Sequence, residues 1–174
     1  MITSEEFPEI GLEVLRGRID PVLINDYALE CETIFINNIE ELSLTRGENS
    51  PGCVSALKKT SPADLWGVGY TAINRVLSGL EVINRGIFVI NWQEPRSSQQ
   101  FHSDIYKRLP VTTVHAHGGG AFDIAPASQT AEEAEKNFVT IELNAGDVVL
   151  QSRAHLKHRG RNRTDFPRIT TVSY

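Results

Sequence analysis

The chain has 174 residues, enough to bury a hydrophobic core without disulfide bonds or a structural metal, and we expect one domain over residues 1–174. Its 40% hydrophobic and 22% charged residues are typical of a globular protein and exclude a disordered chain. The formal net charge of −5 argues against nucleic acid as a partner, because nucleic-acid-binding domains usually carry a basic surface.

The two cysteines, Cys31 and Cys53, are too few for a disulfide framework. The first six residues lack the basic and then apolar pattern of a secretion signal, and no segment approaches the length of apolar chain that crosses a membrane. We therefore expect a cytoplasmic protein with no membrane partner.

Residues 1–85 predict a mixed, largely helical lead-in. Residues 10–15 alternate like a short strand. The pair Asp20-Pro21 then has the form of an N-cap followed by the first helical residue, so we expect a helix from Pro21 to about Leu42.

A second helix is expected to begin at Pro62 and to run toward Leu80, because Ser61-Pro62 repeats the pattern of an N-cap and a first helical residue. Before it, glycine, proline and polar residues gather in residues 45–61 and predict an exposed loop. This loop suits a plain connector or, less simply, a lid beside a substrate.

Residues 86–174 predict a β-rich core, because short alternating segments are separated by turn residues. A charged stretch at residues 131–136 predicts a surface helix or loop, and His158 is expected in a loop. Many short strands after a helical lead-in predict a mainly β fold with flanking helices, a double-stranded β-helix or jelly roll. The expected strands cover residues 86–93, 109–117, 121–124, 138–143, 148–151 and 169–174.

Metal-capable side chains occur at His102 and Asp104, which point to the same side of an extended chain. With His158 they form two histidines and one carboxylate, the set that holds non-haem Fe(II) and leaves other coordination positions open. A single histidine is more often a structural residue than a ligand, so the set carries the hypothesis. His155 competes with His158 for the distal position.

An anion site is predicted on the last strand, where Arg168 and Thr170 share one face. A guanidinium and a hydroxyl suit the far carboxylate of a dicarboxylate. On the strand over residues 86–93, Asn91 or Gln93 suits the same carboxylate, although polar residues at the solvent end of a strand explain them equally well.

Four motifs occur in a familiar order. They are the His102-x-Asp104 pair, the glycine-rich segment 118–128, the Gly146-Asp147 turn with its following strand, and His158 ten residues before Arg168. In this order the chain resembles the iron(II)- and 2-oxoglutarate-dependent dioxygenases, and most of all their phytanoyl-CoA dioxygenase-like branch.

The resemblance implies a metal site and a co-substrate site. Fe(II) would be held by His102, Asp104 and His158, and 2-oxoglutarate by Arg168 and Thr170, with Asn91 nearby. The expected activity is the O2-dependent hydroxylation of a small polar metabolite with formation of succinate and CO2.

Two alternatives stay open. One is a cupin-like metal enzyme that uses His115 and His117, which would face the same way on one strand. The other is a non-catalytic jelly-roll binding module. In addition, six cationic residues between positions 151 and 168 suit either a solvated loop or contact with an anionic substrate.

Overall fold

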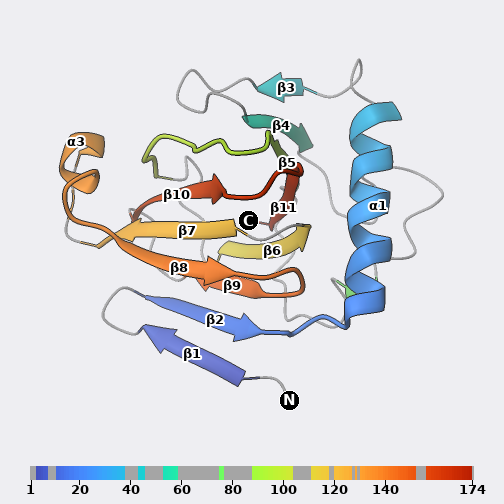
Figure 1. The fold of residues 1–174 in the computed structure, drawn as a ribbon, viewed down its shortest axis with the longest axis horizontal. Helices are drawn as coiled ribbons and strands as arrows, with labels where there is room; N and C mark the ends of the chain where they lie inside the picture. Colours follow the sequence, from blue (N-terminus) through green and yellow to red (C-terminus); the bar gives the residue numbers. More distant parts are fainter. Residues whose placement is uncertain are drawn as a thin grey trace.

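The computed structural model describes residues 3–7, 11–37, 43–45, 53–58, 75–76, 88–103, 111–117, 120–126, 128, 130–151 and 156–173. In these residues the chain forms two antiparallel sheets and a long helix that stands beside them (Figure 1). The expected double-stranded β-helix is confirmed.

The larger sheet contains eight described strands, and every neighbouring pair is antiparallel. Sequence neighbours are often not sheet neighbours, since β11 lies between β5 and β6 and β9 lies between β2 and β6. The spatial order is β1 (Thr3–Phe7), β2 (Leu12–Arg16), β9 (Val148–Gln151), β6 (Val111–His117), β11 (Arg168–Ser173), β5 (Phe88–Gln93), β4 (Cys53–Lys58) and β3 (Ser43–Thr45).

The smaller sheet has the order β10 (Lys157–Asn162), β7 (Gly120–Ala125) and β8 (Val139–Leu143). Residues 97–102 extend it at the free edge of β10. The amide of Gln99 donates to the carbonyl of Gly160, and the amide of Asn162 donates to the carbonyl of Ser97. This segment places His102 beside His158 at the edge of the smaller sheet.

Helix α1 (Pro21–Asn37) packs on the outer face of the larger sheet, against β6 and β11. Its buried side chains form one hydrophobic cluster with Ile90, Val114 and Ile169. Asp20 caps the helix, because its carboxylate accepts a hydrogen bond from the amide of Val22.

A second hydrophobic cluster fills part of the space between the two sheets. It contains Leu12, Val14, Phe122, Ile124, Ile141, Leu143, Val149 and Leu156. Because successive strand residues point to opposite faces, the residues that alternate with the α1-facing ones point into this interior. That interior face of β11 carries Arg168 and Thr170.

Two expectations from the sequence are corrected, and one lies outside the described residues. Helix α1 is described from Pro21 to Asn37, and the expected end near Leu42 falls in residues 38–42, which are not described. The expected loop over residues 45–61 contains strand β4, which pairs with β5 over its whole length. His158 lies in strand β10 and not in a loop, because backbone pairing on both sides holds this segment extended.

Other expected elements are present or lie outside the described residues. The expected strand at residues 10–15 is β2, and the charged stretch contains the short helix α3 (Ala131–Ala134), which Thr130 caps. Of the helix expected from Pro62, only Arg75 and Val76 are described, and both are helical.

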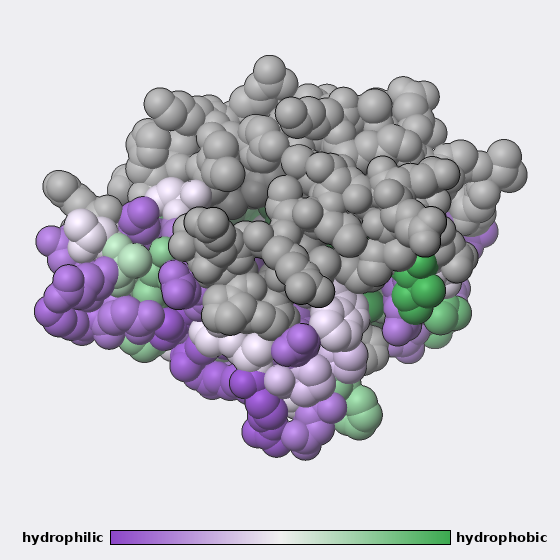
Figure 2. Space-filling model, turned by 90° about the horizontal axis from the view of Figure 1, so that it is seen from above, coloured by the Kyte–Doolittle hydropathy of each residue, from purple (hydrophilic) through white to green (hydrophobic). Residues whose placement is uncertain are grey.

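In the part of the chain that is described, no helix is both long and apolar enough to cross a membrane. Viewed from above, the described residues at the surface are mostly hydrophilic, with a few apolar residues between them (Figure 2).

Candidate metal and co-substrate site

His102 and His158 lie side by side. Each donates its backbone amide to the carbonyl of the other, with N–O distances of 3.0 and 2.9 Å. Their ring centroids are 4.6 Å apart and the rings are tilted by 58°. Two histidines that are 56 positions apart in the chain therefore share one end of the smaller sheet's interior face.

Both rings are oriented by the same local contact. The Nδ1 atom of His102 lies 2.9 Å from the carbonyl of Gln100, and the Nδ1 atom of His158 lies 3.0 Å from the carbonyl of Leu156. Because a carbonyl oxygen only accepts hydrogen bonds, each Nδ1 carries the proton in the neutral ring. The lone pair is then on Nε2, as a histidine metal ligand requires.

The third expected ligand, Asp104, lies outside the described residues, and so does the competing His155. Within the described part of the chain, no three histidine, cysteine, aspartate or glutamate side chains form a group that could hold a metal ion. The described donor set is thus a histidine pair, and two imidazoles suit iron as well as other transition metals.

Arg168 lies at the first position of β11 and is buried, with 4% of its surface exposed. Its Nη1 atom donates to Oε1 of Gln93 at 2.9 Å. Gln93 is held in turn, because its Nε2 atom donates to the carbonyls of Gly160 and Ser97 at 3.1 and 3.2 Å. The orientation of the guanidinium is thereby fixed from β5.

Two glycines make room for the Arg168 side chain. A Cβ atom on Gly120 would lie 2.8 Å from Nε of Arg168, and one on Gly160 would overlap with Nη1. Both glycines belong to the smaller sheet, so the Arg168 side chain crosses the interior from one sheet to the other. We call Gln93, Gly120 and Gly160 the Arg168 cradle.

Thr170 and Asn91 are opposite each other in the pairing of β11 with β5. Thr170 shares the face of Arg168 by alternation, whereas Thr171 points the other way and bonds the hydroxyl of Tyr27 on α1. The three residues expected to bind the co-substrate, Arg168, Thr170 and Asn91, are thus brought together on neighbouring strands.

The two parts of the site are separated by a short, defined span. Gly160, which touches the Arg168 side chain, follows His158 by two residues on β10. Two residues of extended strand span about 7 Å. A small dicarboxylate has the length to reach from the histidine pair to the guanidinium.

The backbone pairing of β6 is irregular at His115 and His117. A register shift in the pairing of β6 with β11 places His115 opposite Thr170 and His117 opposite Ile169. His115 is fully buried, and its backbone carbonyl and amide bond Gly146 and Asp147 in the turn between β8 and β9. The side chain of His117 lies outside the described part of the structure, so the cupin-like alternative stays a prediction.

The cationic residues that follow His158 are engaged by acidic partners. Arg159 and Arg161 both bind the buried carboxylate of Asp123, each at 2.7 Å, and Arg163 pairs with Glu142. These contacts lie on the outer face of the smaller sheet, away from Arg168. They favour neither of the two earlier interpretations, a solvated loop or an anion-binding surface, for these three arginines.

Sequence reasoning placed Arg168 but missed most of its cradle. The sequence offers Gln93 only as an alternative to Asn91, and Gly120 only as one residue of the glycine-rich segment 118–128. Gly160 carried one usable signal, because it follows His158 by two residues and so shares its strand face. That signal depends on knowing that His158 is in a strand.

The fold is shared with solved structures at low sequence identity. OsALKBH1 matches with a TM-score of 0.67 and 11% identity, over 97% of this chain and 99% of that chain. SnoK, a non-haem α-ketoglutarate-dependent carbocyclase from nogalamycin biosynthesis, matches with a TM-score of 0.67 and 15% identity, over 95% of this chain and 79% of SnoK.

HygX from Streptomyces hygroscopicus, solved with nickel, 2-oxoglutarate and hygromycin B bound, matches with a TM-score of 0.57 and 14% identity, over 95% of this chain and 82% of HygX. No protein-family model and no curated protein sequence matches the chain. These likenesses establish the fold, which 2-oxoglutarate-dependent oxygenases also have.

Proposed function

We propose that this chain is a non-haem Fe(II)- and 2-oxoglutarate-dependent oxygenase of the phytanoyl-CoA dioxygenase-like branch, which hydroxylates a small polar metabolite. The observation that carries the proposal is the histidine pair, in which both Nδ1 atoms are directed to backbone carbonyls. His158 lies two residues before Gly160, which contacts the side chain of the buried Arg168. The structural neighbours that act with 2-oxoglutarate support the same class.

In this proposal Nε2 of His102, Nε2 of His158 and the carboxylate of Asp104 hold Fe(II). When bound, iron with 2-oxoglutarate supplies the oxidising chemistry that activates O2 for attack on a C–H bond. The chain itself supplies geometry, because each ring is fixed by a hydrogen bond to the backbone carbonyl two residues before it.

Arg168 binds the far carboxylate of 2-oxoglutarate in this proposal, and the hydroxyl of Thr170 donates to the same group. The guanidinium is buried and already oriented by Gln93, so little side-chain entropy is lost on binding. Asn91, opposite Thr170, lies at the edge of the same site.

The test is turnover of 2-oxoglutarate to succinate with Fe(II), O2 and a panel of small polar metabolites. We expect succinate formation with the wild-type chain. In Asp104→Ala we expect the rate of succinate formation to fall at least about 100-fold, because removal of a direct metal ligand costs no less than removal of a group that orients one. A second readout, circular dichroism, checks that the variant is folded.

A folded wild-type chain that binds Fe(II) but never consumes 2-oxoglutarate would favour the binding module. Metal-dependent oxidation that needs no 2-oxoglutarate and is lost in His115→Ala would favour the cupin-like enzyme. Wild-type turnover by Asp104→Ala would contradict the assigned ligand set.

A further inference from the structure

The outer face of the smaller sheet carries a cluster directly behind the histidine pair. His102 and His158 are paired in an antiparallel bridge, so the residues next to them in sequence, Phe101 and Arg159, point to the opposite face. The guanidinium carbon of Arg159 lies 4.3 Å from the ring centroid of Phe101. The contact between the histidine rings on one face is therefore matched by a cation–π contact on the other.

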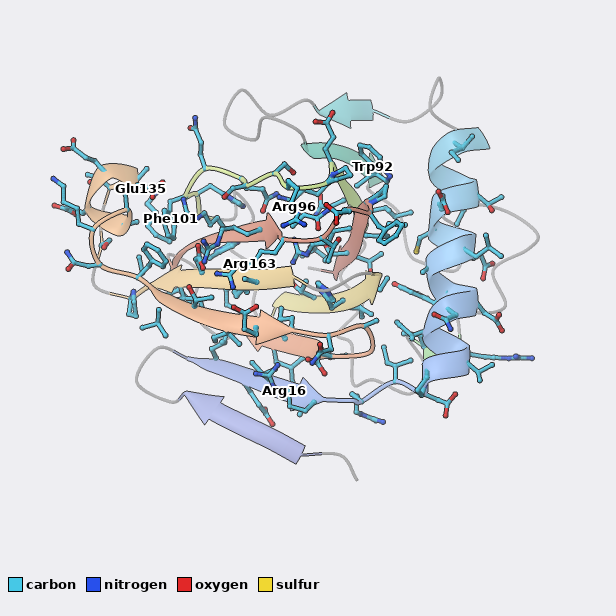
Figure 3. The ribbon with its side chains drawn as sticks, in the orientation of Figure 1. Arg16, Trp92, Arg96, Phe101, Glu135 and Arg163 are labelled. Atoms are coloured by element: carbon cyan, nitrogen blue, oxygen red, sulfur yellow. The ribbon has the colours of Figure 1, made fainter. Side chains whose placement is uncertain are left out.

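Arg159 is fixed from three directions. Its Nε atom binds Asp123 of β7 and its Nη1 atom binds Glu135 after α3, each at 2.7 Å. The guanidinium also lies 5.1 Å from the ring of Phe138. Figure 3 shows Phe101 and Glu135 at the same end of the molecule, beside α3. We call Arg159, Phe101, Asp123 and Glu135 the outer latch.

The backbone that the outer latch holds is irregular. Gln99 pairs with Gly160 and His102 pairs with His158, so Gln100 and Phe101 face the single residue Arg159. This is the two-to-one pattern of a β-bulge. The bulge also presents the carbonyl of Gln100 to Nδ1 of His102, the contact that fixes the His102 ring.

A bulge in an edge segment needs side-chain contacts to fix its register, because backbone pairing alone allows slippage. At this bulge, Phe101 is the side chain that packs on the sheet, with 4% of its surface exposed. It packs with Ala125, Ala134 and Phe138 as well as with Arg159.

We propose that Arg159 and Phe101 are positioning residues that set the register of the His102 segment on β10 and thereby place the two histidine rings for metal binding. The proposal rests on the proposed function for its metal, and it adds that the site is assembled from the opposite face of the sheet.

The test compares Arg159→Lys with Arg161→Lys. Lysine retains a positive charge for Asp123 but loses the flat guanidinium that stacks on Phe101. Arg161 is the matched control, because it binds the same carboxylate and lies 5.7 Å from the Phe138 ring, whereas its strand neighbour on the edge segment is Ser98. Phe101→Leu removes the aromatic ring, and Phe101→Tyr restores it.

Two quantities are measured on folded protein. The first is the dissociation constant for Ni(II) alone, by titration calorimetry. We expect Arg159→Lys and Phe101→Leu to weaken binding about tenfold or more, as loss of orienting contacts does at metal sites, while Arg161→Lys and Phe101→Tyr stay near the wild-type value.

The second quantity is hydrogen exchange at the amides of His102 and His158 in metal-free protein. We expect faster exchange there in Arg159→Lys and Phe101→Leu, with unchanged exchange for the pairs between β7 and β8. Unchanged exchange at both histidines, or equal effects in Arg161→Lys, would overturn the proposal.

The two measurements separate the two ideas. If the wild-type chain bound no metal while exchange at the histidines depended on Arg159, the proposed function would be wrong and the outer latch would still hold the register. If Ni(II) bound equally well to every variant, the latch would have no role in placing the rings.

Discussion

At the residue scale, the absence of a side chain at Gly160 gives Arg168 the space that it occupies. Gly160 allows the guanidinium to lie against β10, and its amide donates to Oε1 of Gln99 at 2.8 Å. Any larger residue at this position requires Arg168 or β10 to move.

Gly160→Ala is therefore expected to displace the guanidinium and to raise the apparent KM for 2-oxoglutarate about tenfold or more, corresponding to about 1.4 kcal/mol of lost binding. Steady-state kinetics measure it. Gly17→Ala is the control, because Gly17 has a φ of 55° with nothing within 4 Å of an added Cβ, so it strains the backbone without touching the site. Equal KM values for Gly160→Ala and wild type would contradict the cradle.

Cys31 offers a pH-dependent test of the core beneath α1. Burial raises the pKa of the Cys31 thiol, and burial likewise raises the pKa of Tyr27. Below about pH 8.5 the thiol is protonated in both the folded and unfolded states, so its contribution does not change with pH. Above that pH only the unfolded thiol loses its proton, and the free energy of unfolding falls by about 1.4 kcal/mol per pH unit.

Denaturant unfolding between about pH 9 and pH 10 should therefore show a shallower loss of stability for Cys31→Ala than for wild type. The test compares how steeply the free energy of unfolding falls with pH in the two proteins. Their stabilities at neutral pH are not the test, because the lost thiol leaves a small cavity in Cys31→Ala. Parallel slopes would mean that Cys31 ionises in the folded protein.

At the element scale, the turn between β8 and β9 joins the two sheets to the N-terminal strands. The buried carboxylate of Asp147 accepts from the amides of Asn144 and Gly17 at 2.9 and 2.8 Å and pairs with Arg16 at 3.0 Å. Gly146 has a φ of 91°, and a Cβ there would lie 2.7 Å from the carbonyl of Ile19. The Gly-Asp motif is thus a structural device that ties β2 to β9.

Asp147→Ala should lower the free energy of unfolding by about 3 kcal/mol, because it leaves buried donors without an acceptor. Chemical denaturation measures the change. Asp165→Ala, which removes an exposed partner of Arg96, serves as the control and should leave the denaturation midpoint unchanged. If Asp147→Ala lost no more stability than Asp165→Ala, the carboxylate of Asp147 would not be what stabilises the turn.

The sequence predicted the strands that have a regular apolar pattern. It missed β10, whose charged side chains pair with residues that are distant in the chain. Residues 148–151 and 169–173 are regular apolar strands and were expected. Strand β10 was missed because Lys157, Arg159 and Arg161 make its outer face charged. Asp123, a neighbour only in the folded chain, pairs with both Arg159 and Arg161.

At the scale of the whole molecule, the candidate site is assembled from separate segments of both sheets. His102 comes from the edge segment, His158 from β10 and Arg168 from β11, and Gln93 reaches Arg168 from β5. Motif order led to three of these residues. The resemblance implied that these three residues come together, but the bulge at residues 100–101 and the space that Gly120 and Gly160 leave for Arg168 are set by backbone pairing that a local pattern does not predict.

The polar interior lies at one part of the barrel, while Leu12, Val14 and Ile141 fill another. Arg168→Ala should accordingly leave the fold intact and act on the co-substrate, raising the apparent KM for 2-oxoglutarate by about 30-fold for a lost charge-assisted contact of about 2 kcal/mol. Titration of Ni(II) alone provides the control, since the metal ligands are unchanged. A 30-fold loss of metal affinity without a change in KM would show that Arg168 supports the metal site and not the co-substrate site.

The most direct test of the proposed function is an anaerobic titration of the metal-free protein, first with Fe(II) and then with 2-oxoglutarate, followed by visible absorption. We predict a weak charge-transfer band when 2-oxoglutarate is added, retained in His155→Ala and absent in His158→Ala. The absence of the band in folded wild-type protein, or its survival in His158→Ala, would contradict the assignment of the metal and co-substrate site.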